Sequence, residues 1–221
     1  MKVIVTGATG LVGHQVLKQC ISTPNITHIY ALSRKQLPDD VATNAKVTVI
    51  TRRLHLVPCI PTRPGLRCRS MCIGGMVQKF PSVEACKLAN VTSTHAAAKA
   101  LAEQVAPKLK EGKKFRFVFC SGMMTEWDQE KRLLFLNDSR KIKGQAEKGL
   151  FDIQDTHPDC FEVYCPRPSG IHDVGAGMVE RMVGKLYSGI GVDEVARAMT
   201  SIAVNGYKEK IIPSDVLKGI K

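Results

Sequence analysis

The chain has 221 residues, of which 44% are hydrophobic and 24% charged, and its formal net charge is +12 at pH 7. These values predict one globular domain spanning residues 1–221 and exclude a disordered chain. The aromatic share of 5% argues against a surface that stacks bases, so nucleic-acid binding is the weakest function that we consider.

No window contains the roughly 18 to 20 unbroken apolar residues of a membrane span, and glycines interrupt the N-terminal apolar run too early for a signal peptide. We therefore expect no membrane contact and a cytoplasmic location. The eight cysteines show no Cys-x-x-Cys spacing, so we expect neither a metal site nor a disulfide framework.

Residues 2–7, KVIVTG, predict a buried strand that leads directly into a glycine-rich turn and a helix beginning at Leu11. Gly7 permits the tight turn, Gly10 lets the backbone approach a pyrophosphate, and Gly13 lets the helix pack close to the sheet. A plain strand-to-helix turn is the alternative interpretation. The candidate dinucleotide-binding residues of this turn are Gly7, Thr9, Gly10, Leu11, Val12 and Gly13.

The second strand is predicted over residues 26–35 and ends in Ser33, Arg34 and Lys35. An acidic residue at this place would accept hydrogen bonds from a ribose 2′-hydroxyl and favour NAD. A hydroxyl followed by two cations suits a 2′-phosphate, so we expect NADP(H) to be preferred over NAD(H). A solvated basic turn is the alternative.

Residues 45–50 predict a third strand and residues 68–75 a fourth, with an atypical basic segment between them. This segment, residues 51–70, has three prolines, five arginines and no clear period. It is interpreted as a solvated irregular loop, as a basic docking patch, or as a stretch that is not a native reading frame.

A helix is predicted over residues 82–109, a fifth strand over 113–122, a sixth strand over 160–171 and a last helix over 192–206. Strands that alternate with helices indicate the α/β class. We expect a Rossmann-like doubly wound parallel sheet, forming a single domain with a small C-terminal extension on the substrate side.

A charged helix between the last two strands carries a stripe of Ser139, Ile142, Lys143, Ala146 and Leu150 on one face. Lys143 therefore lies on the inward side, where its ammonium needs a polar partner such as ribose hydroxyls. The alternative is a lysine that reaches solvent along the helix surface.

Four motifs, TGATGLVG, CIGG, FVFCSG and RPSG, together resemble an atypical short-chain dehydrogenase/reductase of the NAD(P)-binding Rossmann superfamily, in the branch of NmrA-like and nucleoside-sugar-epimerase-like proteins. The resemblance covers nearly the entire chain apart from residues 51–70. It implies that Ile73 and Gly74, at the end of the fourth strand, and Pro166, near the end of the sixth, also contact the cofactor.

The family uses a serine, a tyrosine and a lysine for catalysis, with the tyrosine four residues before the lysine. The resemblance assigns the serine to Ser121 and the lysine to Lys143, which also holds the cofactor, but the tyrosine position is Ser139. Because an aliphatic hydroxyl has a far higher pKa than a phenol, Ser139 is a poor general acid by itself.

The resulting prediction is an NADP(H)-dependent oxidoreductase that acts on a small molecule through an incomplete catalytic site. The alternative is a non-catalytic NADP(H)-binding protein that senses redox state or regulates a partner, as NmrA-like relatives are thought to do. A homodimer or a protein partner stays open.

Overall fold

Parallel strands and helices alternate through the computed structural model of the chain, which describes residues 1–51, 80–109, 111–173 and 189–220. The strands are β1 (Lys2–Thr6), β2 (His28–Ser33), β3 (Val47–Thr51), β4 (Phe115–Val118), β5 (Phe161–Arg167), β6 (Ile171–His172), β7 (Ile190–Gly191) and β8 (Ile211–Pro213). The helices are α1 (Leu11–Ser22), α2 (Asp39–Ala42), α3 (Val83–Lys87), η3 (Leu88–Thr92), α4 (Ser93–Gln104), η4 (Ala106–Lys108), α5 (Asn137–Thr156), α7 (Val192–Asn205) and α8 (Ser214–Gly219).

All strand pairs of the described residues are parallel. β1 pairs with β2 and β2 with β3, while β5 lies between β4 and β8, and β6 pairs with β7. Consecutive side chains of β1 are buried, as expected for a strand that is covered on both faces. The carboxyl ends of β1 and β2 meet at one edge, since Thr6 lies opposite Leu32.

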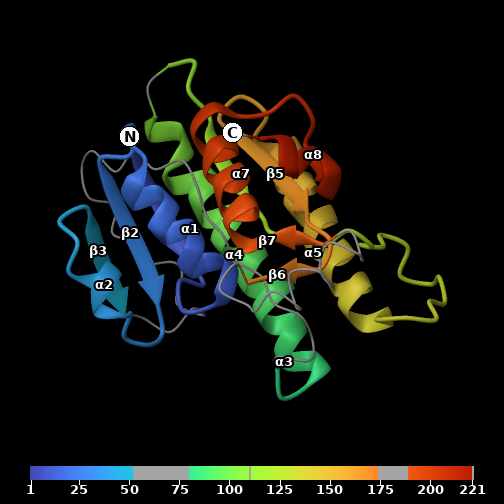
Figure 1. Ribbon diagram of the computed structural model, residues 1–221. Helices are drawn as coiled ribbons and strands as arrows, with labels where there is room; N and C mark the ends of the chain where they lie inside the picture. Colours follow the sequence, from blue (N-terminus) through green and yellow to red (C-terminus); the bar gives the residue numbers. More distant parts are fainter. Residues whose placement is uncertain (52–79, 110, 174–188, 221) are drawn as a thin grey trace.

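Helices cover both faces of the sheet. Val3 and Val5 of β1 belong to the apolar core that includes Leu17 of α1 and Met199 of α7. Ile4, which points to the opposite face, belongs to the core that contains residues of α4 and α5. Figure 1 shows α1 and α7 together on the near face, with α4 behind them. The predicted α/β, Rossmann-like doubly wound fold class is confirmed.

The helix predicted over residues 82–109 is neither regular nor continuous to its predicted end, because the helical run covers residues 83–104. A π-helical turn, Leu88–Thr92, separates α3 from α4, and a short 3-10 turn follows at Ala106–Lys108. Within this run the side-chain amide of Asn90 donates to the carbonyl of Cys86 at 3.0 Å. A π-turn inserts one residue into the helix without ending it, which the apolar period alone does not reveal.

Several predicted features lie outside the described residues. These are the whole predicted fourth strand, residues 68–75, which includes Ile73 and Gly74, and all of the basic segment except Thr51. Most of the predicted substrate-side extension, residues 174–188, also lies outside them. In the described part of the chain, no helix is both long and apolar enough to span a bilayer.

The described cysteines are free thiols, and Cys20 of α1 is buried against α7. Burial raises the pKa of the Cys20 thiol to about 12, and the contact of its Sγ with the Oγ1 of Thr200, at 3.8 Å, opposes that shift only in part. The unfolded thiol ionises near its ordinary pKa of 9.0. The thiol's contribution to stability is therefore fully present below that value and is lost as the pH rises toward 12.

We expect the free energy of unfolding of the wild type to fall with pH more steeply than that of Cys20→Ala above about pH 9, by up to about 1.4 kcal/mol per pH unit. Urea denaturation followed by circular dichroism at a series of pH values measures both slopes. Cys20 is the only residue that differs between the two proteins, so the difference between the two slopes reports on its thiol. Parallel slopes would show that this thiol is not desolvated.

Candidate functional site

The turn between β1 and α1 brings the helix into direct contact with the strand end. Gly7 has a positive φ of 68°, and its carbonyl accepts a hydrogen bond from the Gly10 amide at 2.8 Å. A Cβ on Gly13 would lie 2.1 Å from the Gly7 carbonyl oxygen, so a side chain at this position is excluded. The helix can approach the strand only because Gly13 has none.

The first turn of α1 presents backbone amides at the carboxyl edge of the sheet. His14 makes the first bond of the helical ladder, to the Gly10 carbonyl at 2.8 Å, so the amides of Leu11, Val12 and Gly13 precede that ladder. Gly10 caps the helix without a side chain that could cover these amides. Such a helix start attracts an anion through its N–H groups and its dipole.

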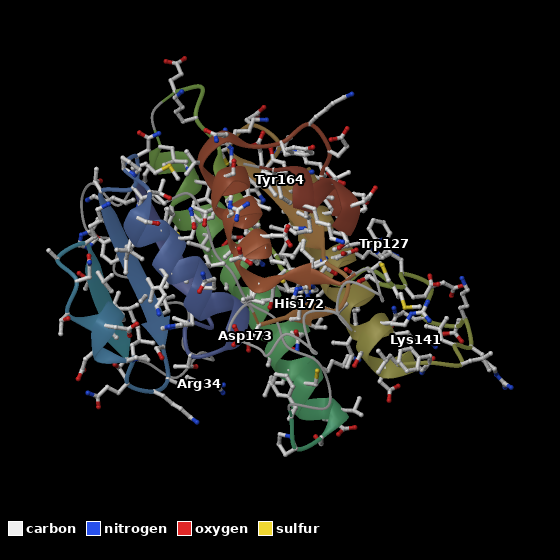
Figure 2. The ribbon with its side chains drawn as sticks, viewed as in Figure 1. Arg34, Trp127, Lys141, Tyr164, His172 and Asp173 are labelled. Atoms are coloured by element: carbon white, nitrogen blue, oxygen red, sulfur yellow. The ribbon has the colours of Figure 1, made fainter. Side chains whose placement is uncertain are left out.

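A second polar turn lies beside the first, at the end of β2. The Ser33 hydroxyl donates to the Lys35 carbonyl at 2.6 Å and accepts from the Lys35 amide at 3.2 Å. This hydroxyl therefore shapes the turn, which leaves Arg34 and Lys35 exposed. Figure 2 shows Arg34 at the carboxyl end of β2. Two cations thus stand close to the glycine turn.

Ser121 and Pro166 lie side by side where the ladder between β4 and β5 continues past the end of β4. The Ser121 amide donates to the Pro166 carbonyl at 2.9 Å, and the Met123 amide donates to the Pro168 carbonyl at 2.9 Å. The two residues come from segments far apart in the sequence. Strand pairing alone therefore joins two of the predicted site residues.

Lys143 is buried on the inward face of α5 and does not reach solvent as the alternative interpretation supposed. Its Nζ donates to the carbonyl of Cys120 at 2.8 Å and lies 4.7 Å from the centre of the Phe119 ring. These contacts hold the ammonium beside the residue that precedes Ser121. The lysine, the serine and Pro166 therefore form one cluster at the carboxyl ends of β4 and β5.

The hydroxyl of Ser121 has a defined partner. Thr125 uses its single hydroxyl hydrogen to donate to the Gly122 carbonyl at 2.7 Å. Ser121 must then donate to Thr125 across their 2.9 Å contact, which leaves lone pairs on the Ser121 oxygen. Ser139 lies one helical turn before Lys143 and is partly exposed.

Sequence reasoning missed an ion pair next to this cluster. The carboxylate of Glu147, which is fully buried, accepts from the Arg167 Nε at 2.9 Å and from the Trp127 Nε1 at 2.6 Å. Arg167 is the last residue of β5, and its guanidinium binds Glu147. One feature of the sequence could have indicated this ion pair. Glu147 follows Lys143 by four residues and so lies on the same inward face of the helix, where a buried carboxylate needs a cationic partner.

His172, in β6, also lies at the carboxyl edge of the strands. Its Nδ1 is buried and has no hydrogen-bond partner among the described residues. Figure 2 shows His172 and Asp173 near the middle of the molecule, between Arg34 on one side and Trp127 on the other. A buried polar atom of this kind is available to a ligand at the same edge.

No protein-family model matches the sequence, and no curated protein matches it significantly. Solved structures do match its fold. A short-chain dehydrogenase/reductase from Saccharomyces cerevisiae has a TM-score of 0.72 and 10% identity, and the match covers 99% of this chain and 98% of that one.

Two further structures were solved with a nicotinamide cofactor. A short-chain dehydrogenase from Burkholderia cenocepacia in complex with NADP has a TM-score of 0.70 at 15% identity, over 97% of this chain and 89% of that one. A UDP-glucuronic acid 4-epimerase from Bacillus cereus in complex with NAD has a TM-score of 0.64 at 14% identity, over 96% and 75%. The chain therefore has the Rossmann-type fold of these enzymes, in agreement with the resemblance of its motifs.

We expect Gly13→Ala to lower the free energy of unfolding by about 1 to 3 kcal/mol, because α1 must move away from Gly7 to admit the methyl group. Gly10→Ala is the matched control, since its Cβ would lie 3.4 Å from the same carbonyl oxygen. We expect it to cost less than about 1 kcal/mol. Chemical denaturation measures both. Equal losses in the two variants would contradict the close approach at Gly13.

Proposed function

We propose that this chain is an NADP(H)-dependent oxidoreductase of the atypical short-chain dehydrogenase/reductase type, acting on a small molecule. The observation that carries the proposal is the glycine turn, in which Gly13 lies directly against Gly7 at the end of the buried parallel strand β1. The turn follows the carboxyl end of β1, and Ser121 and Lys143 lie at the carboxyl ends of β4 and β5. Two solved proteins of this fold are in complex with NADP or with NAD, which supports the assignment.

The residues present fit such a cofactor. The amides of the first turn of α1 would hold the diphosphate, because they precede the helical hydrogen-bond ladder and no side chain at Gly10 covers them. The exposed cations Arg34 and Lys35 would hold a 2′-phosphate, with Ser33 fixing their turn. Pro166 would lie against the nicotinamide, and Ile73 and Gly74 stay predicted contacts.

The catalytic part rests on three side chains. The Lys143 ammonium, already held at the Cys120 carbonyl, would also bind the ribose hydroxyls, and the Ser121 oxygen would accept a hydrogen bond from a substrate hydroxyl. NADPH supplies a hydride when it is bound. Ser139 replaces the usual phenol. At neutral pH its hydroxyl would pass a proton only through a water molecule or with the help of an acidic group of the substrate. Loss of the phenol as general acid costs about 10² to 10⁴ in rate.

The serine at position 139 also favours a second candidate function. A protein that binds NADP(H) without turning it over would serve as a redox sensor or as a regulator of a protein partner. It would need the glycine turn and Lys143 but no general acid. The two candidates share the cofactor and differ only in catalysis.

We expect NADPH to bind more tightly than NADH, by about 10 to 100-fold, because charge-assisted bonds hold the 2′-phosphate. Arg34→Ala should weaken NADPH binding and leave NADH binding unchanged. Arg132→Ala, at an exposed arginine elsewhere, serves as the control. Fluorescence titration of the wild type and the two variants with each coenzyme measures all six dissociation constants. Equal affinity for the two coenzymes would remove the NADP preference, and affinity for neither would overturn the proposed function.

Ser139→Tyr should raise the rate of NADPH oxidation over a panel of small carbonyl compounds by about 10² or more, because it restores a phenol beside Lys143. Ser139→Phe provides the matched control, since it adds the ring without the hydroxyl. The oxidoreductase assignment fails if the wild type binds NADPH tightly and neither it nor the two variants oxidise NADPH with any compound of the panel. The sensor function would then account for the site.

A further inference from the structure

A buried ion pair fixes the elements that carry the predicted catalytic and cofactor-binding residues. The Glu147 carboxylate is fully buried, and it accepts both the Nε and an Nη of Arg167, the Nε at 2.9 Å. The indole N–H of Trp127 donates to the same carboxylate at 2.6 Å. A desolvated carboxylate is tolerated only with such complete pairing, so the geometry of the three side chains is tightly specified.

Each of the three residues neighbours a site residue. Glu147 follows Lys143 by one turn of α5, and Arg167 directly follows Pro166 in β5. Trp127 belongs to the segment that begins at Ser121. The ion pair therefore ties together the helix of the lysine, the strand of the proline and the segment of the serine.

Close packing makes this connection rigid. A Cβ on Gly144, the residue after Lys143, would lie 1.7 Å from the Glu126 carbonyl oxygen, so α5 lies directly on the segment that contains Trp127. The Arg140 side chain of α5 also donates to the Met124 carbonyl at 2.6 Å. With this packing, the position of Lys143 relative to Ser121 depends on how α5 is held against β5.

We propose that Glu147 is a positioning residue that acts through Arg167 and Trp127 to hold Lys143 in its cofactor-binding place. The role assigned to Lys143 rests on the proposed function, whereas its placement by Glu147 does not. Glu147 does not touch the reacting atoms in this assignment. Its charge is needed because the Arg167 guanidinium, which is partly buried beside α5, needs an anionic partner to keep the helix and strand together.

The first test measures how accessible the Lys143 amine is, without any cofactor. Limited acylation followed by mass spectrometry gives the rate at which Lys143 reacts. We expect Glu147→Gln to raise that rate by about tenfold or more, because α5 then separates locally from β5 and exposes the amine. An unchanged rate in folded Glu147→Gln would overturn the proposal.

Glu162→Gln is the matched control. Glu162 pairs with Arg116 between the same two strands, β4 and β5, with the Arg116 Nε 3.3 Å from the Glu162 carboxylate, but near their amino ends and away from the site. We expect this variant to leave the Lys143 rate unchanged. An equal rise in both variants would mean that Glu147 contributes general stability only, and the proposal would be wrong.

The second test is NADPH titration of the same variants. We expect Glu147→Gln to bind NADPH about tenfold or more weakly and Glu162→Gln to bind it as the wild type does. If the wild type binds no coenzyme, the proposed function fails, while the acylation rates still decide whether Glu147 positions Lys143. Tight NADPH binding by Glu147→Gln together with an unchanged Lys143 rate would overturn only the present inference.

If Glu147→Gln does not fold, two milder variants replace it. Trp127→Phe keeps the aromatic ring, which packs on Phe151 with centroids 5.9 Å apart, and removes the N–H donor. Arg167→Lys keeps the positive charge and removes the bidentate hydrogen bonding to the Glu147 carboxylate. We expect both variants to raise the rate of Lys143 acylation, by less than Glu147→Gln would. If Lys143 is acylated at the wild-type rate in both variants, the proposal is wrong.

Discussion

The contact between Gly13 and the Gly7 carbonyl is the constraint on which the rest of the site depends. It lets α1 start directly at the end of β1, so that the first helical amides point to the edge where the parallel strands end. Any side chain at Gly13 would fill the space that this approach requires. The location of the candidate site at this edge follows from that one contact, and the polar turn at Arg34 lies beside it because β2 pairs with β1.

The opposite half of the site is built differently. No glycine contact brings Ser121 and Pro166 together; the continued pairing of β4 with β5 does so. Lys143 then reaches this ladder from a helix, through its bond to the Cys120 carbonyl. The two halves therefore have different requirements, because the first needs a missing side chain and the second needs a helix held at a fixed position.

Much of the fold and part of the candidate site were predictable from the sequence. The glycine spacing, the strand before it and the stripe on α5 indicated the α/β fold, the helix start and the inward side of Lys143, because these depend on local geometry and periodicity. The π-turn before α4 was not predictable, since its residues keep a helical pattern. The pairing of Arg167 with Glu147 was also missed, because a charge in the sequence carries no information about which distant residue faces it.

By itself the sequence determined the fold class and the turn in which a cofactor would be held, since both depend on residues that are close along the chain. The resemblance of its motifs also predicts that Ser139 stands where the family has a tyrosine. Only the tertiary structure decided that Lys143 bonds to the Cys120 carbonyl, that Ser121 lies beside Pro166, and that Glu147 binds Arg167 and Trp127. These contacts join segments distant in sequence, and strand register and helix packing set them through many weak interactions that no short motif encodes.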